Sequence, residues 1–160
     1  PPRRASAVLI LLGTVLVAGL AGPIAGLATG TLSSIVWGLF NPAALPFAAV
    51  SAMVGLLSGV MIAKGMLRNI PLTITAGVVL GVISGMLAAP VAAFVYGGTA
   101  GVGTGALVSL FREMGNSLIG SVTAQSLVSD PLDKALVMII VHVAIRSLPK
   151  KTLASFHART

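Results

Sequence analysis

Charge is the first thing that this sequence lacks. Only 8% of its residues are charged, against about 25% in an average soluble domain. No Asp, Glu, Lys or Arg occurs from residue 5 to residue 63, and none occurs from residue 69 to residue 111. A bilayer core about 30 Å thick is crossed by about 20 apolar helical residues. Because a soluble chain of 160 residues could not bury both stretches, the sequence predicts several membrane-spanning helices.

Cysteine is absent as well, which excludes disulfides and thiolate metal sites. His142 and His157 are far apart and share no metal-ligand spacing. No nucleophile–base pair or pair of catalytic acids stands out, so we expect no catalytic residue, no metal, no cofactor and no enzyme activity. The net charge of +7 comes mainly from basic residues at predicted helix ends and in the C-terminal tail. Membrane proteins place such residues on the cytoplasmic side, so the charge does not predict nucleic-acid binding.

Prolines and polar clusters divide the chain into predicted spans. Pro23 cannot donate a hydrogen bond inside a helix and predicts a break after the first span. We expect spans over residues 7–20, 24–38 and 47–63, a fourth that ends near residue 95 with Pro71 in its first turn, and a last one over residues 131–148.

The start of the last span has its own predicted chemistry. Asp130 fits as the N-cap, Pro131 as the first helical residue, and Asp133 as a first-turn carboxylate that the helix dipole favours. Lys134 follows directly. This interpretation explains the two carboxylates without any ligand.

The stretch between the fourth and last spans is the most unusual. Residues 97–105 are too rich in glycine for a stable helix. Residues 106–127 have a helical pattern but include Arg112 and Glu113, and a charge at the bilayer midplane costs at least about 2.5 kcal/mol. We therefore expect an all-α integral membrane protein, a single domain over residues 1–160. Its predicted architecture is a compact bundle of about five to six short transmembrane helices, with a Gly-rich loop and an outer amphipathic or re-entrant segment over residues 97–130.

Two topologies follow from the charges. With the basic tail in the cytoplasm and residues 106–127 outside, Lys64 and Arg68 also fall inside, and a further helix is expected upstream of residue 1. If residues 106–127 span instead, Arg3 and Arg4 lie inside while Lys64 and Arg68 lie outside. We favour the first count because it places more of the basic residues in the cytoplasm.

Glycines recur four residues apart in three stretches: Gly22 to Gly30, Gly55 to Gly59 and Gly77 to Gly85. Small residues at this spacing let membrane helices approach closely. The stripes therefore predict either tight packing within the chain or docking to a partner helix. The candidate docking residues are Gly22, Gly26, Gly30, Gly77, Gly81 and Gly85.

An ordered set of short strings resembles a known family. The strings lie at residues 12–26, 41–47, 96–104, 127–134 and 146–150. In this order they resemble the substrate-binding S component of energy-coupling factor (ECF) type ABC importers, in an actinobacterial branch whose substrate is unassigned.

The resemblance implies a six-helix protein of the bacterial cytoplasmic membrane with a cytoplasmic C-terminus. Such a subunit captures a small organic micronutrient, usually a vitamin, at its outer face. It delivers the solute by docking on a transmembrane T component, and ATP is hydrolysed by two cytoplasmic ABC ATPases. Its partners would thus be these subunits, the micronutrient and membrane lipid.

A substrate site needs a few polar groups among apolar walls. The candidates that we expect near the outer face are Trp37, Asn41, Tyr96, Thr99, Thr104, Asn116 and Gln125. Each has a simpler explanation: aromatic residues gather at bilayer interfaces, Asn before proline favours turns, and a polar helix face can simply be solvated. His142 in the middle of the last span could serve a solute or proton, or bond to a neighbouring helix.

Two other functions stay open. One is a solitary small secondary transporter, but such proteins place ionisable residues at the midplane, and only His142 fits that requirement here. The other is a ligand-free membrane scaffold that uses its glycine-rich helix faces.

Overall fold

The computed structural model describes residues 2–96, 109–110, 112–115 and 117–148 of the chain. Within these ranges the protein is helical almost throughout, with no strand. The elements are α1 (Pro2–Ala21), α2 (Pro23–Phe40), the 3-10 helix η1 (Pro42–Phe47), α3 (Ala48–Ala63), α4 (Ile70–Tyr96) and α6 (Leu118–Ser147). The predicted all-α fold is confirmed for this part of the chain. The Gly-rich loop, Thr99, Thr104, Asn116 and the basic tail lie outside it.

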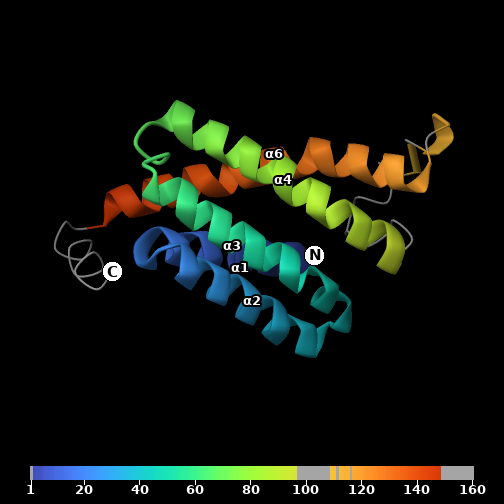
Figure 1. Cartoon of the computed structure of the whole chain (residues 1–160), viewed down its shortest axis with the longest axis horizontal. Helices are drawn as coiled ribbons and strands as arrows, with labels where there is room; N and C mark the ends of the chain where they lie inside the picture. Colours follow the sequence, from blue (N-terminus) through green and yellow to red (C-terminus); the bar gives the residue numbers. More distant parts are fainter. Residues whose placement is uncertain (1, 97–108, 111, 116, 149–160) are drawn as a thin grey trace.

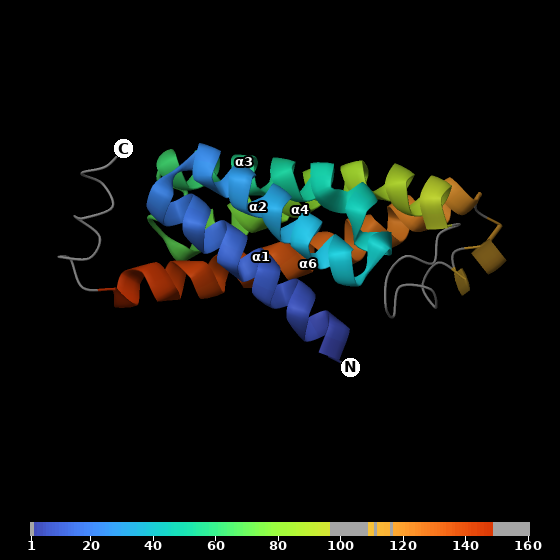
Figure 2. The ribbon, with the colours of Figure 1, turned by 90° about the horizontal axis from the view of Figure 1, so that it is seen from below.

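Successive helices run back and forth along one bundle (Figure 1). α2 and α3 lie side by side, as do α4 and α6. α1 crosses obliquely and contacts α2, α3 and α6 (Figure 2). The end of α2, η1, the end of α4 and the start of α6 gather at one end of the bundle, which we call the η1 end (Figure 1). The α1–α2 junction, the α3–α4 loop and the last turn of α6 gather at the other, which we call the α6 C-terminal end.

The breaks between helices follow from glycine and proline. Gly22 has a positive φ of 89°, a conformation that favours glycine, and it alone separates α1 from α2. Pro23 is the first residue of α2. A backbone N–H at this position has no acceptor within the helix, so proline costs no hydrogen bond there. Pro71 is likewise the second residue of α4. Both predicted helix starts are confirmed.

A five-residue pattern, Gly-x-x-Ser-Gly, recurs where the two helix pairs pack. It begins at Gly55 in α3 and at Gly81 in α4. Gly55 lies against the backbone of Gly26 in α2, and Gly81 lies against the backbone of Pro131 in α6. A Cβ at any of these three glycines would collide with the facing backbone. The absence of a side chain therefore sets how closely each pair approaches.

The serine of this pattern also has the same role in both helices. Ser58 donates to the carbonyl oxygen of Gly55 at 3.0 Å, and Ser84 donates to that of Gly81 at 3.1 Å. Both hydroxyls belong to buried residues. A bond to the helix's own backbone satisfies them without a polar partner across the interface.

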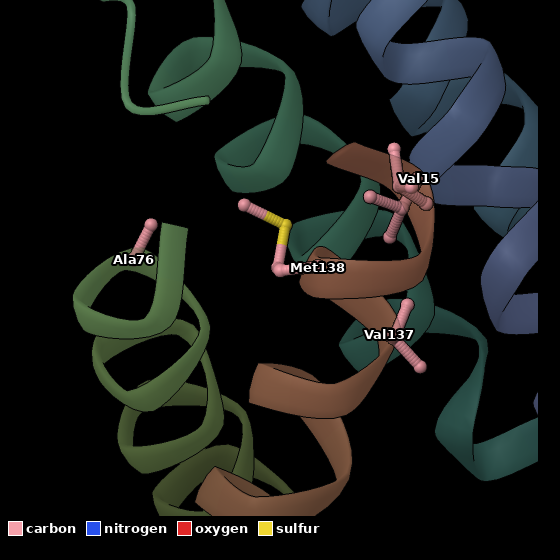
Figure 3. Close-up of a cluster of buried hydrophobic side chains, with 5 residues drawn as sticks. Val15, Ala76, Val137 and Met138 are labelled. Carbon is pink, nitrogen blue, oxygen red and sulfur yellow. The ribbon is translucent and has the colours of Figure 1, made fainter. Parts of the chain in front are cut away.

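An apolar cluster joins the two helix pairs where α1, α4 and α6 meet. Its buried members are Val15 from α1, Ala76 from α4, and Val137, Met138 and Val141 from α6. Figure 3 shows Val15 beside the α6 ribbon and Met138 between α6 and α4. The cluster holds α1 against the α4–α6 pair, and a second, smaller cluster of Ala89 and Val122 lies between α4 and α6.

Three helical stretches are long and apolar enough to cross a membrane: Pro23–Phe40, Leu45–Ala63 and Ile70–Val95. The apolar stretch of α1, Leu9–Ala21, is shorter. Many large apolar side chains on these helices face outward, such as Ile24, Phe40 and Phe94. Such a surface suits lipid rather than water. The structure thus supports a membrane protein, as the composition predicts.

A hydrogen bond fixes which basic residues share an end. Arg146 in the last turn of α6 donates from Nη2 to the carbonyl oxygen of Arg68 in the α3–α4 loop at 2.7 Å. Lys64 and Arg68 therefore lie at the same end as the C-terminal side of α6. This is the arrangement that the favoured charge count requires. The alternative count, which puts them on opposite sides, does not fit it.

The predicted last span is wrong in its start. Ser117, not Asp130, caps the helix: its hydroxyl accepts from the N–H of Gly120 at 3.1 Å. α6 then runs unbroken past Pro131 to Ser147. Residues 118–127 are therefore its first third and not part of a separate outer segment. α6 packs along the length of α4, and the backbone of Pro131 lies against Gly81. This packing favours a continuous helix through the proline.

Candidate functional site

The interface between α4 and α6 is the polar part of an otherwise apolar bundle. Six of the nine buried polar side chains among the described residues come from these two helices. They are Thr73, Ser84, Ser121, Gln125, Ser126 and His142. Polar groups inside a membrane bundle are costly and commonly functional. This interface is therefore the candidate functional site.

Three charged side chains lie at the centre of α6, and we call them the charged triad: Asp130, Asp133 and Lys134. Lys134 donates from Nζ to Oδ2 of Asp133 at 3.1 Å and to Oδ1 of Asp130 at 3.4 Å. The side chain of Lys134 is 14% exposed, that of Asp130 23% and that of Asp133 39%. Asp130 and Lys134 are four residues apart, so they share a helix face.

The triad packs against the glycines of α4. The carbonyl oxygen of Lys134 lies near Gly77, and that of Asp130 lies near Gly81. A Cβ at Gly85 would lie 3.1 Å from Oδ2 of Asp130. Gly81 and Gly85 stand near the middle of α4, which is long enough to cross a membrane. The triad therefore lies close to mid-depth in the bundle.

The capping interpretation of these residues is wrong, because all three stand in the helix interior. Pro131 has no N–H, so the carbonyl of Leu127, four residues earlier, loses its helical donor. This carbonyl and the two carboxylates thus lie within residues 127–133, about two turns of the continuous helix α6.

The triad can bind a cation or a proton. In ionised form, two carboxylates and one ammonium leave one negative charge in excess. A solute ammonium group, a small cation or a proton on one aspartate can balance it. Among the described residues, no group of three or more His, Asp or Glu side chains is close enough to hold a metal ion.

His142 lies nearer the α6 C-terminal end and is 5% exposed. Its Nδ1 is 3.1 Å from Oγ1 of Thr73 in α4. Thr73 also reaches the carbonyl oxygens of Asn69 at 3.0 Å and Met66 at 3.3 Å. The Thr73 hydroxyl has only one proton to donate. If Thr73 donates that proton to a loop carbonyl, Nδ1 of His142 carries a proton and donates to the Thr73 oxygen. The predicted bond to a neighbouring helix is thus present.

Three predicted substrate residues belong to the η1 end. Trp37 is half-buried in the last turn of α2, and the backbone N–H of Asn41 donates to its carbonyl oxygen at 2.9 Å. Tyr96 is the last residue of α4. Figure 1 shows that the ends of α2 and α4 lie at this same end. Arg112 and Glu113, which precede α6, are exposed.

Gln125 lies at the polar interface itself. It is buried in α6, and its Nε2 donates to Oγ of Ser129 at 2.5 Å. Ser129 in turn donates to the carbonyl oxygen of Gln125 at 3.0 Å. Gln125 stands about one turn before Asp130, between the η1 end and the triad. Sequence reasoning found this residue but placed it on an outer segment.

The glycines considered for docking are used within the chain. Gly26 and Gly30 lie against α3, at Gly55 and Ser51. Gly77, Gly81 and Gly85 lie against α6, and Gly22 occupies the α1–α2 turn. In this arrangement the chain's own helices cover five of the six positions. Close packing within the fold accounts for those five without a partner.

The comparisons with known proteins identify no relative. No family model matches the chain, no curated protein matches it, and neither does any solved structure.

Proposed function

We propose that the protein is a solute-capturing membrane subunit, the substrate-binding S component of an ECF-type importer in a bacterial cytoplasmic membrane. The observation that carries the proposal is the polar α4–α6 interface inside a bundle of apolar helices. The ordered resemblance supports it, since the string at residues 127–134 contains the whole charged triad.

The proposed path starts at the η1 end, which faces outward in this proposal. A small organic micronutrient enters near Trp37, Asn41 and Tyr96 and moves toward Gln125. As the resemblance implies, a transmembrane T component and two ATPases then deliver the solute to the cytoplasm.

Co-purification tests this proposal. The complete gene is co-expressed with the host's T component and ATPases, and the tagged protein is isolated in mild detergent. Recovery of one further membrane protein and two nucleotide-binding subunits is the expected result. Recovery of this protein alone, where a known S component retains the others, contradicts the proposal.

A second candidate is a solitary secondary transporter, which the charged triad specifically favours. Its midplane carboxylates supply the ionisable groups that cation or proton coupling needs. The test uses the purified chain in liposomes with a pH-sensitive dye inside. Proton movement driven by an imposed gradient and lost in Asp130→Asn supports this candidate against the first.

A further inference from the structure

Three basic residues lie at the α6 C-terminal end: Lys64, Arg68 and Arg146. Lys64 ends α3, and a turn with Gly65 at a positive φ of 81° brings Arg68 back beside it, since the N–H of Arg68 donates to the carbonyl oxygen of Gly65 at 2.9 Å. Arg146 is tied to the same loop by its bond to the Arg68 carbonyl. All three residues are exposed. We call them the basic cluster.

No side-chain carboxylate of the chain neutralises this cluster. The sequence has only three acidic residues. Asp130 and Asp133 accept from Lys134, more than two turns before Arg146 along α6. Glu113 precedes α6, which begins at Leu118, so the whole length of α6 separates it from Arg146 along the chain. Thirteen helical residues separate Asp133 from Arg146, which is about 20 Å. The anion that balances the cluster must come from outside the described chain.

The surface beside the cluster is apolar. Ile70 and Ile74 follow the loop on one face of α4 and are exposed, as are Ile140 and Val143 on one face of α6. A ligand at the cluster therefore meets positive charge at the helix ends and apolar side chains along the helices. This combination fits an amphiphile with an anionic head and an acyl tail.

We infer that the basic cluster binds the headgroup of an anionic phospholipid, whose acyl chain lies along the apolar flank of α4 and α6. The bond from Arg146 to the Arg68 carbonyl uses one guanidinium donor and leaves others for phosphate oxygens. The site depends on the loop geometry and not on the capture of a solute. It therefore stands or falls separately from the proposed importer.

The test measures lipid retention by the full chain. The protein is purified in mild detergent and titrated with phosphatidylglycerol or phosphatidylcholine of identical acyl chains, and bound lipid is counted by native mass spectrometry. The variants are Lys64→Gln and Arg146→Gln. Lys64→Gln is the more informative variant. Among the described residues, the Nζ of Lys64 makes no hydrogen bond, so its loss should not unfold the loop. Arg112→Gln, an exposed arginine before α6, is the control for net charge.

Preferential binding of phosphatidylglycerol is the expected result. Each variant in the cluster should weaken it about fivefold, the effect of one basic residue near an anionic surface, and Arg112→Gln should leave it unchanged. Equal binding of the two lipids overturns the inference. So does an equal loss in Arg112→Gln and Lys64→Gln, or full competition by glycerol phosphate, which lacks acyl chains. Retention of a co-purifying protein that Lys64→Gln releases, without any lipid preference, also overturns it.

Discussion

The α2–α3 and α4–α6 interfaces share a packing pattern but differ in the groups that face its glycines. In both, a helix with Gly-x-x-Ser-Gly faces an antiparallel helix that contains a proline at the contact. At α2–α3 the glycines Gly26 and Gly55 meet backbone to backbone. At α4–α6 only α4 supplies the glycines. Gly81 also lies against facing backbone, whereas the atom nearest to the Cβ position of Gly85 belongs to the Asp130 side chain.

This difference shows what the α4 glycines provide. Where Gly26 and Gly55 face each other, neither helix places a side chain at the contact. At Gly85, by contrast, the missing side chain leaves room beside α6 for a side chain of that helix. The position that a Cβ of Gly85 would occupy is 3.1 Å from a carboxylate oxygen of Asp130. The same small-residue pattern therefore closes one interface and accommodates a charge in the other.

The largest expected effect comes from filling the glycines. Gly55→Val and Gly81→Val each place a side chain against facing backbone, which cannot move aside as a flexible side chain can. We expect neither variant to yield a folded, monodisperse protein by size-exclusion chromatography. Gly13→Ala is the control, since nothing lies within 4 Å of its Cβ position. Wild-type behaviour of either valine variant would show that the pair can separate without loss of the fold.

Removing the cation of the triad should have the next largest effect. Lys134→Met leaves two carboxylates at the α4–α6 interface without their donor. We expect a loss of about 3 kcal/mol in the free energy of unfolding, the lower end of the cost when a buried ion pair loses one partner. The measurement is unfolding in detergent. Adding Asp130→Asn and Asp133→Asn should restore stability, and Lys64→Met, at an exposed site, should change little. If the triple variant has a lower free energy of unfolding than Lys134→Met, the unpaired carboxylates do not explain the loss of stability.

A smaller effect is expected at the bond that joins α4 to α6 near the loop. Thr73→Val removes the partner of His142 Nδ1 and should cost about 1–2 kcal/mol, because a buried donor is left unpaired. Thr75→Val is the matched control: its hydroxyl donates only within α4, to Pro71, and is exposed. We expect the control to stay within about 0.5 kcal/mol of wild type. Equal unfolding midpoints for the two variants would mean that the His142 pair adds nothing to stability.

The smallest effects test whether the two interfaces are equivalent. Ser58→Ala and Ser84→Ala remove the same bond to a glycine carbonyl, so each should cost about 0.5–1 kcal/mol in unfolding experiments. Similar values support a shared packing role. A clearly larger loss for Ser84→Ala would indicate that this serine also supports the polar groups of α6.

Several features of the fold were readable from local sequence. Pro23 after Gly22 predicts the α1–α2 break, and Pro71 predicts the start of α4, because both depend on backbone geometry within a few residues. The charge count also predicts that Arg68 lies at the end where α6 finishes, and their hydrogen bond agrees. The candidate site can be predicted only in part from the sequence. Sequence reasoning proposes Gln125 as a substrate residue, whereas it explains Asp130 and Lys134 as parts of a helix start.

The error at Asp130 and Pro131 has a physical origin. Asp followed by Pro is a good local signal for a helix start, since the carboxylate can cap and proline needs no donor. Ser117, thirteen residues earlier, gives an equally good cap. Local chemistry does not choose between them, and the spacing of Asp130 and Lys134 on one helix face was the available signal for a continuous helix.

By itself, the sequence determined that the helices suit a membrane, that the fold is all-α, and where most of the helices break. These features depend on the distribution of charge and on the backbone limits of glycine and proline, which act locally. The tertiary structure decided which helices pair, which glycines face a backbone, and that Pro131 continues a helix. Those outcomes depend on the long α4 surface against which α6 packs. Only that contact places Asp130 and Lys134 of the charged triad beside the glycines of α4.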